Sequence, residues 1–289
     1  MPSHVVDRLA ERTRAWGRPA SAVAAALNAI YRTARPLQGL FNGTWLGHPL
    51  HPLVTDVAVG AWTVVLVFDL VGIAFPGAGL GPAAALALWI GVLAGLVALA
   101  SGATDWKDTY GPAQRIGFLH GLLMLVVVVL YVVSGALRVA GPIDGLAARL
   151  VAIVGFVGLA AGGFLGGELA FGFGSMVDHN AFRDGLPKFV RVALLDDLAQ
   201  GLNYVEAAGQ PVLLVRDGDA LAAIGDVCSH AGGPLHEGTI EGGVVTCPWH
   251  GSRFRVADGT TVRSPATFPQ PAYEVRVMEG QVEVRGGRR

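Results

Sequence analysis

The sequence predicts an α + β chain of two parts, a four-helix transmembrane bundle followed by a small all-β domain. Three observations support this fold class. Apolar residues make up 52% of the 289 residues and charged residues only 15%, against about 25% charged residues in an ordinary soluble domain. The apolar excess lies between Leu46 and Phe173, and the chain beyond it has the composition of a soluble domain. From about residue 188, short β-branched runs separated by glycine turns replace the long apolar stretches.

Residues 1–40 are expected to form one or two amphipathic helices before the membrane domain. Apolar residues recur there at helical spacing, namely Val5, Val6, Leu9, Val23, Leu27, Ile30 and Tyr31. Arginines lie among them, which favours a helix on the cytoplasmic lipid surface; the alternative is a solvated helical face. The segment has no apolar stretch followed by a small-residue cleavage site, so no secretory signal is expected.

Four long apolar stretches follow, at about 52–75, 83–103, 116–140 and 147–173. Each is at least as long as the roughly 20 residues that cross the hydrocarbon core of a bilayer. The links between them are short and rich in glycine and proline, so consecutive helices are expected to be antiparallel neighbours. Residues 41–180 are therefore predicted to form a four-helix transmembrane domain.

Four crossings place both ends of this domain on one side of the membrane, and the distribution of Lys and Arg indicates which side. Eleven of these residues lie on the side of the termini and two on the other. The eleven are Arg8, Arg12, Arg14, Arg18, Arg32, Arg35, Lys107, Arg115, Arg183, Lys188 and Arg191, and the two are Arg138 and Arg149. Because short cytoplasmic loops are enriched in Lys and Arg, both termini are predicted to be cytoplasmic, in the cell inner or plasma membrane.

Residues 188–289 are predicted to form the all-β domain. Runs that contain β-branched residues occur at 211–216, 220–224, 243–246, 273–278 and 281–285. Turn pairs such as Asp217-Gly218 and Glu279-Gly280 separate them. The domain is therefore expected to be a compact set of short strands with ligand-bearing loops.

Two short boxes in this domain carry the two cysteines of the chain. The first contains Cys228 and His230, the second contains Cys247 and His250, and glycines surround both. Two thiolates and two imidazoles suit a [2Fe-2S] cluster in which sulfur ligates one iron and nitrogen the other. Tetrahedral zinc also accepts two Cys and two His, but zinc fingers usually pair Cys with Cys and His with His. The interleaved order therefore favours the cluster.

The boxes resemble those of the Rieske family, over about residues 188–289. The resemblance implies a β-sandwich whose two loops hold the cluster near its tip, with Cys228, His230, Cys247 and His250 as ligands. It also implies that electrons enter and leave at the exposed imidazole edge. After His250 the sequence contains no histidine, so the mononuclear iron site of an oxygenase is not expected. The domain is predicted to be an electron carrier.

Departures from the quinol-oxidising branch of that family bear on the reduction potential. That branch has an extra cysteine in each box, joined as a disulfide, where this sequence has Gly233 and Trp249. Ser252 matches a serine that donates a hydrogen bond to a cluster sulfur in high-potential members, whereas Phe254 stands where those members have a tyrosine. The potential is therefore expected between those of the ferredoxin-like and quinol-oxidising classes. His179 and His236 are expected to be ordinary surface residues rather than additional ligands.

Ionisable residues in membrane helices are costly and by default suggest function. Those in or near the four stretches are His48, His51, Asp56, Asp69, His120 and Glu168. The runs Gly47-His48-Pro49-Leu50-His51-Pro52 and Gly102-Ala103-Thr104-Asp105-Trp106 resemble a widespread bacterial family of four-helix membrane proteins, over about residues 41–180, and this resemblance implies a fold but no activity.

The membrane histidines have three possible roles. His51 or His48 could form, with His120, the axial ligand pair of a b-type haem. The polar groups could instead form a quinone head-group site or a proton site, or could only cap helix ends.

The leading functional hypothesis is a membrane-anchored Rieske protein that passes electrons between a soluble redox partner and a membrane site. The alternatives are a membrane redox sensor and a ferredoxin component of an oxygenase system. A net charge of −1 gives no electrostatic reason to expect a nucleic-acid partner. The expected contacts are a soluble redox protein, membrane lipid and, if the membrane site is a quinone site, quinone.

Overall fold

The computed structural model describes Arg8 and residues 11–287, so Val5, Val6 and Leu9 of the expected N-terminal helix lie outside the described residues. The chain divides into two compact units. One comprises the described residues up to Ala34 together with Leu50–Ser175, and the other comprises Arg35–Pro49 and the described residues from Met176 onward.

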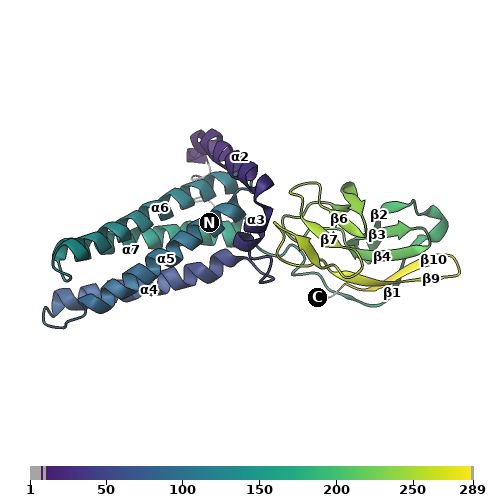
Figure 1. Ribbon diagram of the computed structural model, residues 1–289. Helices are drawn as coiled ribbons and strands as arrows, with labels where there is room; N and C mark the ends of the chain where they lie inside the picture. The colour runs from purple at the N-terminus through teal and green to yellow at the C-terminus, as the bar shows by residue number, and fades with distance from the viewer. Residues whose placement is uncertain (1–7, 9–10, 288–289) are drawn as a thin grey trace. The chain divides into compact units, whose positions relative to one another are not determined.

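Four long helices form a bundle in the first unit, and they confirm the predicted bundle (Figure 1). They are α4 (Leu50–Ala74), α5 (Gly81–Trp106), α6 (Gly111–Ala140) and α7 (Leu146–Gly167). A π-helical turn, η2 (Glu168–Gly172), extends α7. Each helix is long and apolar enough to cross a membrane. Within the bundle, α4 packs chiefly on α5, and α6 packs chiefly on α7.

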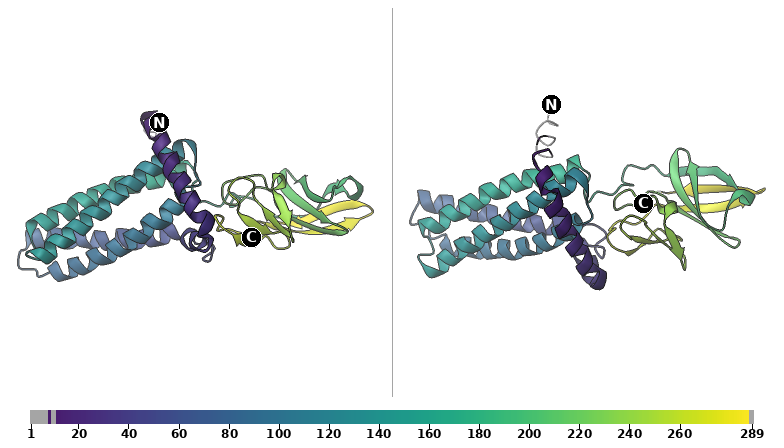
Figure 2. Two further views of the ribbon diagram at one scale, coloured as in Figure 1. Left: turned by 45° about the horizontal axis from the view of Figure 1, so that its top comes forward. Right: turned by 90° about the horizontal axis from the view of Figure 1, so that it is seen from above.

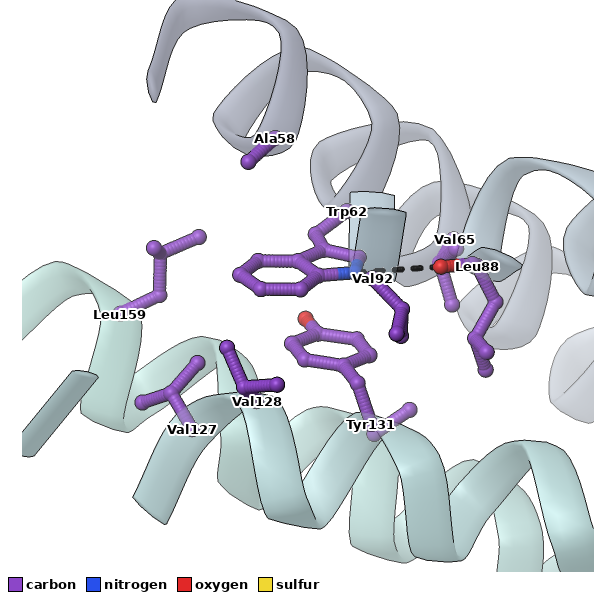
Figure 3. Close-up of a cluster of buried hydrophobic side chains, with 10 residues drawn as sticks. Ala58, Trp62, Val65, Leu88, Val92, Val127, Val128, Tyr131 and Leu159 are labelled. Carbon is purple, nitrogen blue, oxygen red and sulfur yellow. Dashed lines mark hydrogen bonds between the residues drawn. The ribbon is translucent and has the colours of Figure 1, made fainter. Parts of the chain in front are cut away.

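The middle of the bundle is held by an aromatic pair. The rings of Trp62 and Tyr131 stack with centroids 4.1 Å apart and planes 3° from parallel, and Figure 3 shows them between the helices, with the Trp62 Nε1–H donating to the Leu88 carbonyl. Glycines on the facing helices make room for them, since a Cβ at Gly155 would lie 3.1 Å from Tyr131 Cε2 and Gly91 faces the Trp62 indole. The glycine-rich sequences of α5 and α7 thus permit close packing around large rings.

A shorter helix, α2 (Gly17–Thr33), packs on the bundle near the point where α5 ends and α6 begins (Figure 2). A short 3-10 turn, η1 (Arg14–Trp16), precedes it. The Tyr31 hydroxyl is hydrogen-bonded to Thr104 Oγ1 at 2.6 Å, and the Ser21 hydroxyl donates to Gln114 Oε1 at 3.0 Å. The contact face of α2 is therefore anchored by polar bonds. A second short helix, α3 (Arg35–Asn42), belongs to the other unit.

The second unit contains two antiparallel sheets, as expected for an all-β domain. The larger sheet has the strand order β1-β10-β9-β4-β3-β2 and the smaller has the order β5-β6-β7-β8. The strands are β1 (Leu186–Leu194), β2 (Gly201–Ala207), β3 (Gln210–Asp217), β4 (Ala220–Gly225), β5 (Thr239–Glu241), β6 (Val244–Thr246), β7 (Arg253–Arg255), β8 (Thr261–Arg263), β9 (Ala272–Met278) and β10 (Gln281–Gly286). Short 3-10 turns lie at η3 (Leu195–Asp197) and η4 (Leu235–Glu237).

Turn chemistry sets the strand register in this unit. The pair Glu279-Gly280 connects β9 to β10 with both residues at positive φ, 50° and 73°, which is the geometry of a tight hairpin turn between twisted strands. The β4–β5 connection carries the first cysteine box and the β6–β7 connection carries the second. Both boxes are thus loops anchored on strands.

Candidate functional site

The first cysteine box is a tight loop closed by two backbone hydrogen bonds. The Cys228 N–H donates to the Gly233 carbonyl at 2.9 Å, and the Gly232 N–H donates to the Cys228 carbonyl at 2.9 Å. Gly232 has φ of +79°, a conformation that residues with a Cβ rarely adopt. The loop therefore turns back on its own cysteine.

The second box repeats this arrangement. The Cys247 N–H donates to the Ser252 carbonyl at 2.8 Å, and the Gly251 N–H donates to the Cys247 carbonyl at 3.1 Å. Gly251 has φ of +74°. In both boxes a glycine four residues after the cysteine makes the turn, so the two loops share one backbone design. Sequence reasoning noted the glycines but not this shared spacing.

The two thiols meet in the interior between the loops. Cys228 is 1% exposed and Cys247 is 3% exposed, and their side chains share a hydrogen bond that raises the pKa of Cys228, together with burial, and lowers the pKa of Cys247 to about 7. Backbone N–H groups of His230 and Ala231 donate to the first sulfur, and those of Trp249 and His250 donate to the second. N–H donors of this kind favour the thiolate, which is the form that binds metal.

The two box imidazoles also meet. The ring centroids of His230 and His250 are 5.0 Å apart and their planes are nearly perpendicular, at 86°. Both rings are half-buried, in contrast to the fully buried cysteines. The loops thus pair sulfur with sulfur and nitrogen with nitrogen, and this donor set fits a [2Fe-2S] cluster that has thiolates on one iron and imidazoles on the other.

Gly233 and Trp249, which occupy the places of the disulfide cysteines in the quinol-oxidising branch, are in contact. A Cβ at Gly233 would lie 3.0 Å from Trp249 Cγ and 3.0 Å from Cys247 Sγ. The indole therefore covers the glycine backbone and joins the two loops by packing where the other branch uses a covalent bond.

The two positions considered for tuning are both buried. Ser252 is 0% exposed, and its Oγ accepts a hydrogen bond from the Ala266 N–H at 3.0 Å. That bond uses a lone pair and leaves the hydroxyl proton available to another acceptor. Phe254 lies in the apolar cluster that also contains both cysteines and presents no polar group there.

A buried carboxylate precedes the first box, and sequence reasoning missed it. Asp226 is 2% exposed; its Oδ1 accepts from the His236 N–H at 2.8 Å and its Oδ2 accepts from His236 Nδ1 at 2.7 Å. The His236 ring also lies 4.9 Å from the Tyr204 ring. The side chain of His236 is therefore fixed by Asp226. The other histidine considered as an additional ligand, His179, lies beside Gly232 of the first box. The sequence offered no signal for the pairing, because ten residues separate the partners.

The structure brings two of the three singled-out histidines together in the membrane unit, whereas His48 belongs to the other unit. His51 on α4 and His120 on α6 have ring centroids 6.5 Å apart and planes at 86°. His51 Nδ1 lies 2.9 Å from the Ala98 carbonyl and His120 Nδ1 lies 3.0 Å from the Gly162 carbonyl. His48 is exposed, and its Nδ1 is bonded to the adjacent Pro49 carbonyl.

At the opposite end of the bundle the ionisable residues form a buried ion-pair cluster. Arg138 Nη2 donates to Asp69 Oδ2 at 2.5 Å, Arg149 Nε lies 3.8 Å from Asp69 Oδ1, and Arg149 Nη2 donates to Asp144 at 2.5 Å. Arg138 and Arg149 are the two basic residues assigned to the non-cytoplasmic side. Both are therefore neutralised by carboxylates rather than exposed as free charges.

Comparisons with known proteins agree with the fold of both parts of the chain. Residues 188–274 match the family described as Rieske [2Fe-2S] domain, and residues 47–179 match the family described as predicted membrane protein (DUF2231). The chain belongs to the Rieske family through its C-terminal domain, and its helical bundle is similar to this membrane family.

Several curated relatives of the Rieske domain are ferredoxins. The chain is 39% identical over 102 residues to ferredoxin CarAc of Metapseudomonas resinovorans, covering 34% of this chain and 94% of that one. It is 37% identical over 94 residues to the anthranilate 1,2-dioxygenase ferredoxin subunit of Burkholderia cepacia, covering 32% and 87%. Among solved structures, the ferredoxin of carbazole 1,9a-dioxygenase from Nocardioides aromaticivorans IC177 matches at 36% identity with a TM-score of 0.33, covering 34% of this chain and 98% of that one.

Proposed function

We propose that this multi-pass membrane protein is an electron carrier in which Cys228, His230, Cys247 and His250 hold one [2Fe-2S] cluster. The observation that carries the proposal is the pairing of two buried thiols and two half-buried imidazoles by two loops of the same backbone design. The family match of residues 188–274 supports it. A zinc site is disfavoured because the ligands alternate along the chain.

When bound, the cluster accepts and donates one electron. Its two imidazole ligands raise its reduction potential above that of clusters with four cysteine ligands. The chain's own contribution is the environment of the ligands. Backbone N–H groups donate to both sulfurs and stabilise the thiolates, and the apolar cluster around Cys228 and Cys247 keeps water from that side. The half-buried imidazoles of His230 and His250 form the edge through which a partner exchanges electrons.

The proposed partners are a soluble redox protein and a site within the membrane unit, occupied by a b-type haem or a quinone. The basic residues on the side of the termini support an orientation with both termini and the Rieske domain in the cytoplasm. The arginine-rich N-terminal segment would then lie at the inner lipid surface.

A second candidate function is the ferredoxin component of an oxygenase system, held at the membrane. The observation that favours it is what the relatives are named as. CarAc and the anthranilate 1,2-dioxygenase subunit are ferredoxins, and the Rieske domain covers most of the length of each. In that case the cluster would deliver electrons to a soluble oxygenase rather than to the membrane unit.

The test uses the full chain purified in detergent. We expect the electron paramagnetic resonance signal of a reduced Rieske cluster in the wild type, its loss in Cys228→Ser and His250→Ala, and its retention in the control His179→Ala. Zinc in stoichiometric amount without that signal would contradict the proposal. Reoxidation of the reduced protein by a short-chain quinone would favour the membrane route, and reoxidation by a soluble oxygenase component alone would favour the ferredoxin role.

A further inference from the structure

The histidine pair of the membrane unit joins the two halves of the bundle. His51 lies in the first turn of α4, and His120 lies in the third turn of α6. Because α4 packs chiefly on α5 and α6 on α7, the two rings come from different helix pairs and approach one another across the boundary between the pairs. The same boundary holds the stacked Trp62 and Tyr131 further along the bundle.

Backbone carbonyls determine the tautomer of both rings. A carbonyl oxygen only accepts hydrogen bonds, so the Nδ1 atoms of His51 and His120 must donate to Ala98 and Gly162 respectively. Burial among apolar helices favours the neutral ring, and a neutral ring protonated at Nδ1 carries its lone pair at Nε2. Both histidines are thus prepared as Nε2 ligands, in the manner of metal-binding histidines whose other nitrogen donates to a carbonyl.

The distance between the rings fits two imidazoles on opposite sides of one metal. A metal–nitrogen bond of about 2.0 Å and about 1.1 Å from ring nitrogen to ring centre put two opposed centroids about 6.2 Å apart. The His51–His120 centroids are 6.5 Å apart. The same bond lengths at a tetrahedral angle give about 5.1 Å, and the His230–His250 centroids, predicted to share one tetrahedral iron, are 5.0 Å apart. The two histidine pairs thus match two different coordination geometries.

We propose that His51 and His120 are the two axial ligands of a b-type haem bound between the helix pairs. The inference rests on the proposed function and selects haem as the occupant of its membrane site. Within the described residues, no further His, Cys, Asp or Glu lies close enough to bind the same metal ion as this pair. A bare ion would therefore have two such side-chain ligands. A porphyrin supplies four nitrogens and needs only the two axial imidazoles.

The tautomer also argues against quinone. The carbonyl oxygens of a quinone need hydrogen-bond donors, and in this tautomer neither Nε2 can donate. The Nδ1 protons are already used by Ala98 and Gly162. The pair therefore offers lone pairs to an electrophilic metal rather than protons to a carbonyl.

Glycines at the histidine level set the ring positions. A Cβ at Gly102 would lie 2.7 Å from His51 Cε1, and a Cβ at Gly166 would lie 3.4 Å from His120 Cε1. His51 lies in the run 47–52 and Gly102 in the run 102–106, the two runs that resemble the membrane family. The two runs are therefore in contact at His51. An alanine at 102 would displace the His51 ring, whereas an alanine at 166 would meet His120 at ordinary contact distance.

The test is haem content and optical spectroscopy of the full chain, expressed with a haem precursor and purified in detergent. We expect a single haem per chain by pyridine haemochrome assay and a low-spin reduced spectrum in the wild type. His51→Ala and His120→Ala should each lose the haem, and Gly102→Ala should lower its content. His48→Ala and Gly166→Ala are the matched controls and should keep it.

His51→Met keeps the inference testable where alanine variants fold poorly. A thioether can replace one axial imidazole, so this variant should retain haem with a raised midpoint potential, an effect that a merely structural histidine would not produce. The cluster signal is recorded on the same samples. Wild-type protein with its cluster but without haem, or with a bare metal or quinone at this level, would overturn the haem assignment and leave the cluster intact. Absence of the cluster signal would instead refute the proposed function.

Discussion

Replacement of Ser252 by alanine tests how the protein sets the cluster potential. The Ser252 hydroxyl is fully buried in the second box, and its oxygen accepts from the Ala266 N–H. Its proton is therefore available for the hydrogen bond to a cluster sulfur that the resemblance to high-potential Rieske proteins implies. Because the reduced cluster carries one more negative charge, a hydrogen bond to sulfur stabilises the reduced state more than the oxidised state. Ser252→Ala should accordingly lower the midpoint potential.

The expected shift follows from ordinary hydrogen-bond energies. Hydrogen bonds to charged groups contribute about 1.5–3 kcal/mol and neutral ones about 0.5–1.5 kcal/mol, so the difference between redox states is about 1–2 kcal/mol. At about 59 mV per 1.4 kcal/mol for a one-electron couple, this corresponds to about 40–85 mV. A potentiometric titration of the full chain, followed by the cluster signal, measures it directly.

Ser229→Ala is the matched control. Ser229 is 1% exposed and adjacent to Cys228, but its hydroxyl already donates to the Phe268 carbonyl at 2.7 Å. The control removes a buried hydroxyl from the first box without removing a bond to the cluster, so its potential should stay near that of the wild type. Equal shifts in the two variants would refute the reasoning, because the effect would then come from polarity or packing in general.

Three further predictions concern stability and the cluster. Asp69→Asn leaves Arg138 buried without its carboxylate and should destabilise the bundle by about 3–5 kcal/mol. The control Asp144→Asn changes a half-exposed carboxylate and should cost at most about 1 kcal/mol. Equal losses of stability in the two variants, measured by thermal unfolding in detergent, would contradict this. Burial lowers the pKa of His179 despite the nearby Asp178, so the unfolded chain binds more protons than the folded chain and stability should fall as pH drops below about 6.5. His179→Gln should therefore be more stable than the wild type at pH 5 but not at pH 8. A difference in stability that is the same at both pH values would exclude His179 titration as the cause. Cys247→Ser should abolish the cluster and lower the unfolding temperature of the C-terminal unit, since ligand binding energy is folding energy; an unchanged unfolding temperature would show that the loops fold independently of the cluster.

Much of the fold could be predicted because its determinants are local. The four spans are contiguous apolar stretches whose length alone identifies them. The hairpins of the β domain follow from glycine-containing turns such as Glu279-Gly280, which force positive φ. Within each box the proposed ligands are only a few residues apart in the sequence. Their closeness in space could therefore be predicted from the sequence alone.

The contacts between distant residues could not be predicted in the same way. Sequence reasoning paired His120 with His51 or, as the alternative, with His48. The structure places His51 in the first turn of α4, whereas His48 precedes that helix and belongs to the other unit. The ion pair between Asp69 and Arg138 and the bond between Asp226 and His236 likewise depend on which surfaces meet after folding. A pattern in one segment carries no information about the partner that a side chain finds on another.

The distribution of ionisable groups along the bundle limits what the membrane unit can do. His51 and His120 lie near one end, and the cluster of Asp69, Arg138 and Arg149 lies at the other. The intervening stretches 57–68, 85–101, 121–137 and 150–163 contain no His, Asp, Glu, Lys or Arg, and the stacked Trp62 and Tyr131 lie between the two levels. Proton pumps and transporters rely on successive ionisable side chains through the membrane. An electron carrier that exchanges with one side alone needs no such series, so these four stretches are compatible with the one-sided electron exchange proposed above.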